Sequence, residues 1–137
     1  MKAYFGRRYR FSASHRLHSE ALSEAENRAT YGKCNNPHGH GHNYVVEVLA
    51  EGEVDAATGM VVNLATFDEV VRIRIIERFD HVNLNLDPIF TAEVPTTENL
   101  CREIFRLLTG TIEPANLAQV RVEETENNFF EYRGEQG

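Results

Sequence analysis

The feature that most constrains the fold of this chain is a run of histidines that alternate with glycine and lead straight into a strand-forming segment. The run reads His38-Gly39-His40-Gly41-His42-Asn43, and it is followed by Tyr44-Val45-Val46-Glu47-Val48-Leu49. Alternate side chains of a β-strand lie on the same face, and β-branched and aromatic residues favour strands. A strand from about His40 to Gly52 therefore points two imidazoles, those of His40 and His42, to one side.

A metal site needs more than two ligands, and the N-terminal segment offers a third histidine. If residues 3–15 form a strand, one of its faces is mostly apolar and consists of Phe5, Arg7, Tyr9, Phe11, Ala13 and His15. An apolar face points inward, so His15 is expected at the rim of the core. Taken alone, His15 is better explained as a hydrogen-bonded core histidine. Together with His40 and His42 it makes a three-histidine set whose open fourth position is typical of catalytic zinc.

The other histidines of the first half of the chain are weaker candidates. His38 has the same strand parity as His40, but it follows Pro37 and is also explained as a solvated loop residue. His18 is expected in a surface loop.

Length and charge exclude several classes of protein. The 137 residues fit a single domain, residues 1–137, and no stretch approaches the roughly 20 apolar residues that span a bilayer. The net charge of −7 argues against nucleic-acid binding. No secretory leader precedes the first strand pattern, so a cytoplasmic location is expected. An anionic substrate would need a local basic patch, for which the chain offers Arg7, Arg8, Arg10, Arg16 and Lys33.

The order of the expected elements is ββααββ. After strands 3–15 and 40–52, helices are expected from Asn63, with apolar residues through Phe79, and from Thr96 or Thr97 to Gly110. Strands at 118–125 and 129–133 follow, joined by a tight turn. Ser23-Glu24-Ala25-Glu26 reads as a capping box that starts a short helix, and Met60-Val61-Val62 is a possible short strand.

This order predicts an α+β fold, with a four-stranded antiparallel sheet and two helices on one face. The sheet edges would be exposed in a monomer, and exposed edges are normally covered or paired. We therefore expect an oligomer that joins sheets edge to edge.

The two cysteines lie in different settings. Cys101 falls on the apolar stripe of the second long helix and is expected to be an inert core thiol. Cys34 lies in a polar loop beside Lys33 and six residues before His40, where a nearby cation would favour the thiolate. It is a candidate nucleophile, base or fourth zinc ligand, and the alternative is a loop cysteine without a role.

Two acidic positions complete the candidate chemistry. A carboxylate can set the tautomer of a histidine, so Asp80 and His81 form a candidate pair if a turn lets them face each other; the alternative is a helix end with a cationic histidine. Glu124 continues the apolar face of Ala118, Val120 and Val122, so it is expected at the rim of the core, paired, or facing a ligand; the alternative is a rim glutamate in water. A carboxylate there can accept two parallel N–H bonds from a pterin or purine edge.

The segments together resemble the 6-pyruvoyl-tetrahydropterin synthase family. The matching pieces occur in family order along nearly the whole chain: Phe11-Ser12-Ala13-Ser14-His15-Arg16-Leu17, Gly32-Lys33-Cys34-Asn35-Asn36-Pro37, Gly39-His40-Gly41-His42-Asn43-Tyr44, Asp80-His81, Pro95-Thr96-Thr97-Glu98-Asn99 and Glu124-Thr125 before Asn127-Asn128. One departure is His38, where relatives usually carry asparagine.

The resemblance implies a tunnelling fold, in which a trimer closes a twelve-stranded barrel and two trimers form a homohexamer. It implies conversion of 7,8-dihydroneopterin triphosphate to 6-pyruvoyl-tetrahydropterin with elimination of triphosphate. It assigns Zn2+ to His15, His40 and His42, and proton transfer to Cys34, with Asp80 and His81 contributed across a subunit interface. The pterin anchor is Glu124, and the pocket is lined by Thr96, Thr97 and Glu98.

The resemblance leaves the product open. The same fold family includes 6-carboxy-tetrahydropterin synthase of queuosine biosynthesis, which uses the same substrate but typically has a shorter spacing between the cysteine and the histidine pair. A non-catalytic zinc- and pterin-binding module is the alternative from another functional class.

Overall fold

The alternating segments at the start of the chain form the longest hairpin of the structure, a computed structural model that describes residues 1–135. Strand β1 (Lys2–His15) pairs antiparallel with β2 (His40–Glu53) along its whole length. The register runs from Lys2 opposite Glu53 to His15 opposite His40. The pairing therefore brings the three expected histidine ligands to one end of the hairpin.

The sheet has five strands in the order β3-β1-β2-β4-β5. Strands β4 (Asn116–Thr125) and β5 (Asn128–Tyr132) form the expected C-terminal hairpin. Strand β3 (Val82–Asn83) pairs parallel with β1. The prediction of a four-stranded, fully antiparallel sheet is therefore wrong, both in the number of strands and in the direction of this edge strand. Two residues show no periodicity in a sequence, and β3 exists because its partner β1 is present beside it.

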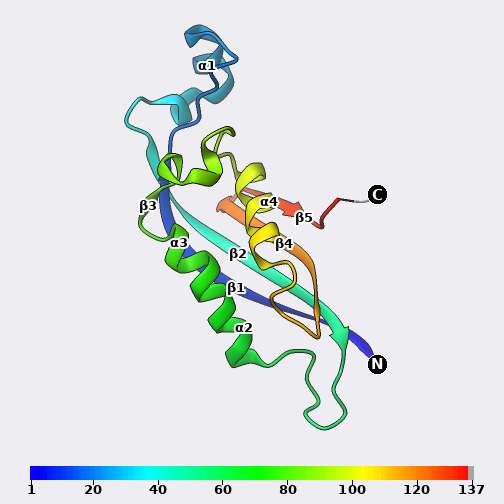
Figure 1. Cartoon of the computed structure of the whole chain (residues 1–137). Coiled ribbons are helices and arrows are strands. Elements are labelled where there is room, and N and C mark those ends of the chain that lie inside the picture. Colours follow the sequence, from blue (N-terminus) through cyan, green and yellow to red (C-terminus); the bar gives the residue numbers. More distant parts are fainter. Residues whose placement is uncertain (136–137) are drawn as a thin grey trace.

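Helices lie over one face of the sheet (Figure 1), and the apolar core residues pack between the helices and the sheet. Asn63 caps α2 (Leu64–Val71), which continues through a π-helical turn (η2, Arg72–Ile76) into α3 (Glu77–Phe79). Thr96 caps α4 (Thr97–Leu108), which ends two residues before the expected Gly110. The α+β class and both long helices are confirmed. The segment Met60-Val61-Val62 is not a strand.

Short helices build the connections. The capping box at Ser23 is confirmed at the start of α1 (Glu24–Tyr31), which leads into the 3-10 helix η1 (Gly32–Asn35). Two further 3-10 turns, η3 (Leu84–Leu86) and η4 (Pro88–Phe90), follow β3. Within residues 1–135, no helix combines the length and the hydropathy that a bilayer crossing requires.

One face of the sheet is the core face. Tyr44, Val46, Val48 and Ala50 of β2 are fully buried there with Val120 and Val122 of β4, beneath the apolar stripes of α2 and α4. The opposite face carries charge, because Glu47 lies near both Arg8 and Arg121. The core face ends at His15, His40 and His42, so the candidate ligands lie where the apolar layer stops.

Candidate metal centre and active site

Four ligand atoms converge at the end of the β1–β2 hairpin. The side chains of His15, Cys34, His40 and His42 each offer one ligand atom, and these atoms all lie within 4.8 Å of one another. Strand pairing positions the histidines, and η1 brings Cys34 against them. The backbone N–H of Leu17 donates to the Cys34 carbonyl at 2.7 Å, which ties η1 to the end of β1.

His15 is held as a metal ligand would be. The residue is 1% exposed, and its Nδ1 lies 3.0 Å from the carbonyl oxygen of Pro95. Since a carbonyl only accepts, Nδ1 carries the proton and Nε2 keeps its lone pair. Metal-binding histidines are commonly oriented by such a bond from the second ring nitrogen.

The residues present fit a bound cation. The Nε2 atoms of His15, His40 and His42 are buried and have no hydrogen-bond partner among the described residues, although unpartnered buried polar atoms are rare. A carboxylate oxygen of Glu124 lies 2.8 Å from His42 Nε2, but off the direction in which a ring N–H would point. A cation ligated by these three nitrogens would satisfy all of them.

Burial favours the neutral, metal-binding form of two histidines but the protonated form of the thiol. It lowers the pKa of His15 and of His42, which favours the neutral imidazole that binds metals. Burial also raises the pKa of the Cys34 thiol, and the negative charge of Glu124 raises it further. The expected influence of Lys33 on the thiol is wrong, because the Lys33 side chain is exposed and lines a different cavity.

A glycine permits the close approach of β2 to His15. Gly39 has a φ of 71°, a left-handed conformation that side chains disfavour. A Cβ atom on Gly39 would lie 2.7 Å from the His15 carbonyl oxygen, far inside van der Waals contact. The glycine before His40 therefore serves the geometry of the cluster as well as the turn.

Glu124 lies beside the cluster, at the rim where the sequence placed it. Its side chain is 14% exposed, and one oxygen is 4.0 Å from His15 Nε2. The other oxygen accepts a hydrogen bond from the Thr97 hydroxyl. Thr96 instead uses its hydroxyl to cap α4, where it accepts from Asn99 N–H at 3.2 Å. Glu98 is exposed in the first turn of that helix.

Asp80 and His81 form the expected pair, at the edge of the sheet. His81 has a φ of 60°, and this turn allows its Nδ1 to lie 3.1 Å from an Asp80 oxygen. The other Asp80 oxygen accepts from Ser12 N–H at 2.9 Å, and His81 N–H donates to the Ser12 carbonyl at 2.6 Å. Within residues 1–135, no hydrogen bond or ion pair joins this pair to Cys34. A cavity of about 410 Å³ borders both His81 and His42.

The sequence did not predict the groups that orient these side chains by hydrogen bonds. The Pro95 carbonyl that orients His15 and the Ser12 backbone that holds Asp80 leave no signal, because a backbone group is the same in every residue type. Tyr44, whose hydroxyl is 3.3 Å from His15 Nδ1, was detectable, since it shares strand parity with His42.

The family model for 6-pyruvoyl tetrahydropterin synthase matches residues 4–135. The chain belongs to this family.

Individual synthases are similar over nearly the whole chain. The human 6-pyruvoyl tetrahydrobiopterin synthase is 48% identical over 135 residues, which cover 98% of this chain and 93% of the human protein. The solved structure of the Caenorhabditis elegans 6-pyruvoyl tetrahydropterin synthase superposes with a TM-score of 0.93 at 44% identity, covering 98% of this chain and 97% of that one. A putative 6-carboxy-5,6,7,8-tetrahydropterin synthase of Archaeoglobus fulgidus is 35% identical over 84% of this chain and 91% of its own length.

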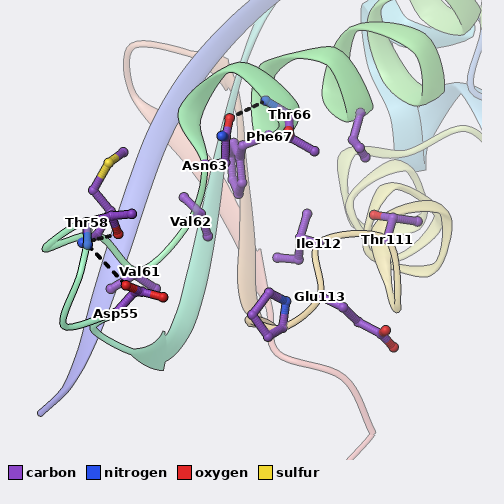
Figure 2. A pocket seen from close by; sticks show the side chains of 13 residues that line it. Asp55, Thr58, Val61, Val62, Asn63, Thr66, Phe67, Thr111, Ile112 and Glu113 are labelled. Carbon is purple, nitrogen blue, oxygen red and sulfur yellow. Dashed lines mark hydrogen bonds between the residues drawn. The ribbon is translucent and has the colours of Figure 1, made fainter.

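A different cavity, of about 300 Å³, lies between the β2–α2 connection, α2 and the connection from α4 to β4 (Figure 2). It is lined largely by apolar side chains, among them Val61, Phe67 and Ile112. Two of its polar side chains are already engaged, because Asp55 accepts from Thr58 N–H and Asn63 accepts from Thr66 N–H (Figure 2). It contains none of the residues expected in the synthase site.

Proposed function

We propose that this protein converts 7,8-dihydroneopterin triphosphate to 6-pyruvoyl-tetrahydropterin, with elimination of triphosphate, in a zinc-dependent reaction. The observation that carries the proposal is the convergence of three partnerless histidine nitrogens and one thiol at the rim of the core. Membership of the synthase family supplies the substrate and the reaction. The tetrahydropterin product and triphosphate together contain the atoms of the substrate, so no external redox cofactor is needed.

The proposed ion is Zn2+, held by His15, His40 and His42. Zinc accepts neutral imidazole and thiolate ligands and leaves a coordination position open in catalytic sites. A bound zinc ion would supply a Lewis acid for the side-chain hydroxyls of the substrate and positive charge beside the Cys34 thiol.

The residues of the chain have distinct proposed roles. Cys34 takes a proton from the substrate side chain as a general base, and His81, oriented by Asp80, returns a proton. Glu124 accepts N–H bonds from the edge of the pterin ring, and its bond from Thr97 fixes the carboxylate in place. Thr96 and Glu98, at the start of α4, line the pterin pocket.

The proposed assembly is a homohexamer made of two trimers, each of which closes a twelve-stranded barrel from neighbouring sheets. It brings Asp80 and His81 of one subunit to the Cys34 of another, which agrees with the lack of a direct link within one chain. The proposed domain is the single unit 1–137, and the proposed location is the cytoplasm.

Product analysis tests the reaction. We expect purified protein incubated with 7,8-dihydroneopterin triphosphate to release triphosphate and yield 6-pyruvoyl-tetrahydropterin, measured by mass spectrometry. The 6-carboxy product would favour the second candidate, which the Archaeoglobus relative supports at lower identity. Binding without turnover would identify a non-catalytic zinc- and pterin-binding module.

Metal analysis tests the zinc assignment separately. We expect one zinc per chain, and a large loss of zinc in His42→Ala. His38→Ala is the matched control, because His38 is exposed and lies outside the cluster. Full zinc retention in all three alanine variants, at His15, His40 and His42, would contradict the assignment.

A further inference from the structure

The position of the Cys34 thiol depends on the turn that carries it. Within residues 1–135 the Cys34 sulfur makes no hydrogen bond, so its place beside the histidines follows from the position of its backbone. The turn, η1, follows α1, which extends beyond the end of the β1–β2 hairpin (Figure 1). A segment that extends away from the sheet needs bonds back to it if the thiol is to keep a fixed distance from the histidines.

The last residue of this turn, Asn35, supplies three such contacts. Asn35 is 7% exposed, and its Nδ2 donates to the Leu17 carbonyl at 2.7 Å. The same nitrogen lies 3.1 Å from His18 Nδ1, and the Asn35 carbonyl accepts from Arg16 Nε at 3.3 Å. One asparagine therefore contacts three consecutive residues, and these directly follow the expected ligand His15.

The bonds to Leu17 attach the turn at two points. The Leu17 N–H donates to the Cys34 carbonyl at 2.7 Å, and the Leu17 carbonyl accepts from the Asn35 side chain. Leu17 is itself buried, so the bonds lie away from solvent. Hydrogen bonds in such surroundings are stronger electrostatically than bonds in water. Two bonds to one residue fix both the distance and the orientation of the turn.

The segment that Asn35 binds is also held by a second asparagine. Asn85 of η3 accepts from the Arg16 N–H at 2.7 Å and donates through Nδ2 to the Arg16 carbonyl at 2.9 Å. The residues after His15 are therefore tied to η3 as well as to η1. An attachment to a fixed segment transmits position, whereas an attachment to a mobile loop would not.

Another buried asparagine in this part of the chain makes only local bonds. Asn27 of α1 is fully buried and its Nδ2 donates to three carbonyls, those of Ser19, Leu22 and Ser23. These partners lie within 8 residues of Asn27, so its bonds stabilise α1 and the loop before it. The partners of Asn35 are 17 to 19 residues away and follow the strand that carries a ligand.

We propose that Asn35 is the positioning residue for Cys34: its amide sets the distance between the thiol and the three histidines. The inference rests on the proposed function for the role of the thiol and goes beyond it by naming the side chain that places it. A displacement of about 1 Å can cost a reaction about 100-fold in rate. A small loosening of the turn should therefore be visible in kcat.

An aspartate at this position tests the role, because Asn35→Asp keeps the shape and replaces the donating nitrogen by an accepting oxygen. That oxygen would face the Leu17 carbonyl, and the turn should detach. We expect kcat for 7,8-dihydroneopterin triphosphate to fall by about 10–100-fold, with KM and zinc content as in the wild type. Labelling of Cys34 by iodoacetamide, located by peptide mass spectrometry, should be about fivefold faster, because one lost hydrogen bond shifts an opening equilibrium by about that factor.

Asn27→Asp is the matched control, because it makes the same exchange at a buried amide that, among the described residues, bonds neither β1 nor η1. It should lower the melting temperature and leave kcat and Cys34 labelling as in the wild type. Equal changes in both variants would overturn the positioning role. If Asn35→Asp fails to assemble, Asn35→Ala, which adds no charge, is judged by the same criteria.

Thiol labelling separates this inference from the proposed function, because it requires no substrate. A wild type without turnover would reject the proposed function, while faster labelling of Asn35→Asp than of Asn27→Asp would still support the positioning role. Normal turnover by the wild type, with kcat and labelling unchanged in Asn35→Asp, would overturn the positioning role and leave the proposed function standing.

Discussion

Among single residues, alanine substitutions of Cys34 and Cys101 are predicted to have the most different effects. Cys34 is half-buried in the cluster, whereas Cys101 is fully buried and its Sγ donates to the Val120 carbonyl at 3.2 Å. A positioned general base contributes about 10²–10⁴-fold to a rate, so Cys34→Ala should lower kcat by that factor and keep its zinc. Cys101→Ala, the control, should lower the melting temperature more than kcat. Loss of zinc in Cys34→Ala would make the thiol a fourth ligand.

Glu124 gives a second prediction at this scale. Glu124→Gln keeps the shape of the side chain and removes the charge that would accept N–H bonds from the ring. The loss of one charge-assisted bond should weaken pterin binding by about 1.5–3 kcal/mol, measured as the Kd of 7,8-dihydroneopterin. Glu123→Gln is the matched control, because Glu123 pairs with Arg121 instead. Equal affinity in wild type and Glu124→Gln would exclude the anchoring role.

Single residues also show how far sequence reasoning reaches into the site. Strand parity predicted that His15, His40 and His42 share a face, because a period of two holds in any paired strand. It did not predict that Glu124 would lie 2.8 Å from His42, since that distance depends on the pairing of β2 with β4. The thiol pKa was misjudged for a related reason. Sequence proximity made Lys33 the neighbour of Cys34, while burial and Glu124 dominate in space.

At the scale of elements, the turn into β2 controls the cluster. Gly39→Ala would introduce a left-handed alanine and a Cβ only 2.7 Å from the His15 carbonyl oxygen. We expect β2 to shift away from β1 at this end, with loss of zinc and of stability. Gly59→Ala is the control, because Gly59 also has a positive φ, 74°, but nothing within 4 Å of its Cβ position. Gly59→Ala should lower the free energy of unfolding only by the backbone strain, about 1–2 kcal/mol, and should retain zinc. Equal zinc content in both variants would contradict the role of the close approach.

The ion pair between Arg78 of α3 and Asp87, the residue that caps η4, predicts a pH-dependent stability. Asp87 accepts two N–H bonds from Arg78, at 2.9 and 2.8 Å, and one from Ile89 N–H at 3.0 Å. The Arg78 guanidinium, helped by the Ile89 bond and opposed by burial, holds the pKa of the Asp87 carboxyl below its ordinary value of 3.8. A lowered folded-state pKa contributes stability that is fully present above pH 3.8 and lost as the pH falls through the folded pKa.

Asp87→Asn should therefore lower the free energy of unfolding by about 1–2 kcal/mol at neutral pH. Urea titrations at several pH values should show the difference from wild type shrinking as the pH falls below 3.8. Glu69→Gln, which breaks an exposed ion pair with Arg72, serves as the control and should change little. A difference that is constant with pH would show that the charge of Asp87 does not stabilise the fold.

The elements that sequence reasoning found are those with local signals. Capping residues and apolar periodicity located α1, α2 and α4, because Ser23, Asn63 and Thr96 each accept a backbone N–H bond within the first turn. Strand β3 and the π-helical turn at Arg72–Ile76 were missed. Both depend on the packing of the folded chain, because two strand residues and one widened turn are too short to show a periodic pattern in the sequence.

At the scale of the whole molecule, the arrangement of the site predicts shared active sites. Cys34 lies in the cluster, whereas His81 is exposed at the sheet edge beside β3 and is held there by Ser12. Strand β5 forms the other edge of the sheet. An assembly that joins sheets edge to edge would bring the His81 of one subunit toward the Cys34 of the next. Native mass spectrometry should accordingly show six chains per particle.

Subunit complementation tests this sharing directly. Cys34→Ala and His81→Ala should each be nearly inactive alone, but co-assembled hexamers should regain about a quarter of wild-type turnover. Random mixing of equal amounts gives each site an even chance of an intact Cys34 from one chain and an even chance of an intact His81 from its neighbour. Mixing Cys34→Ala with the double variant Cys34→Ala/His81→Ala is the control and should regain nothing. If co-assembled single variants stay inactive while mass spectrometry shows mixed hexamers, both residues must act within one chain, and the assembly would have to bring them together by closing the sheet edge onto its own cluster.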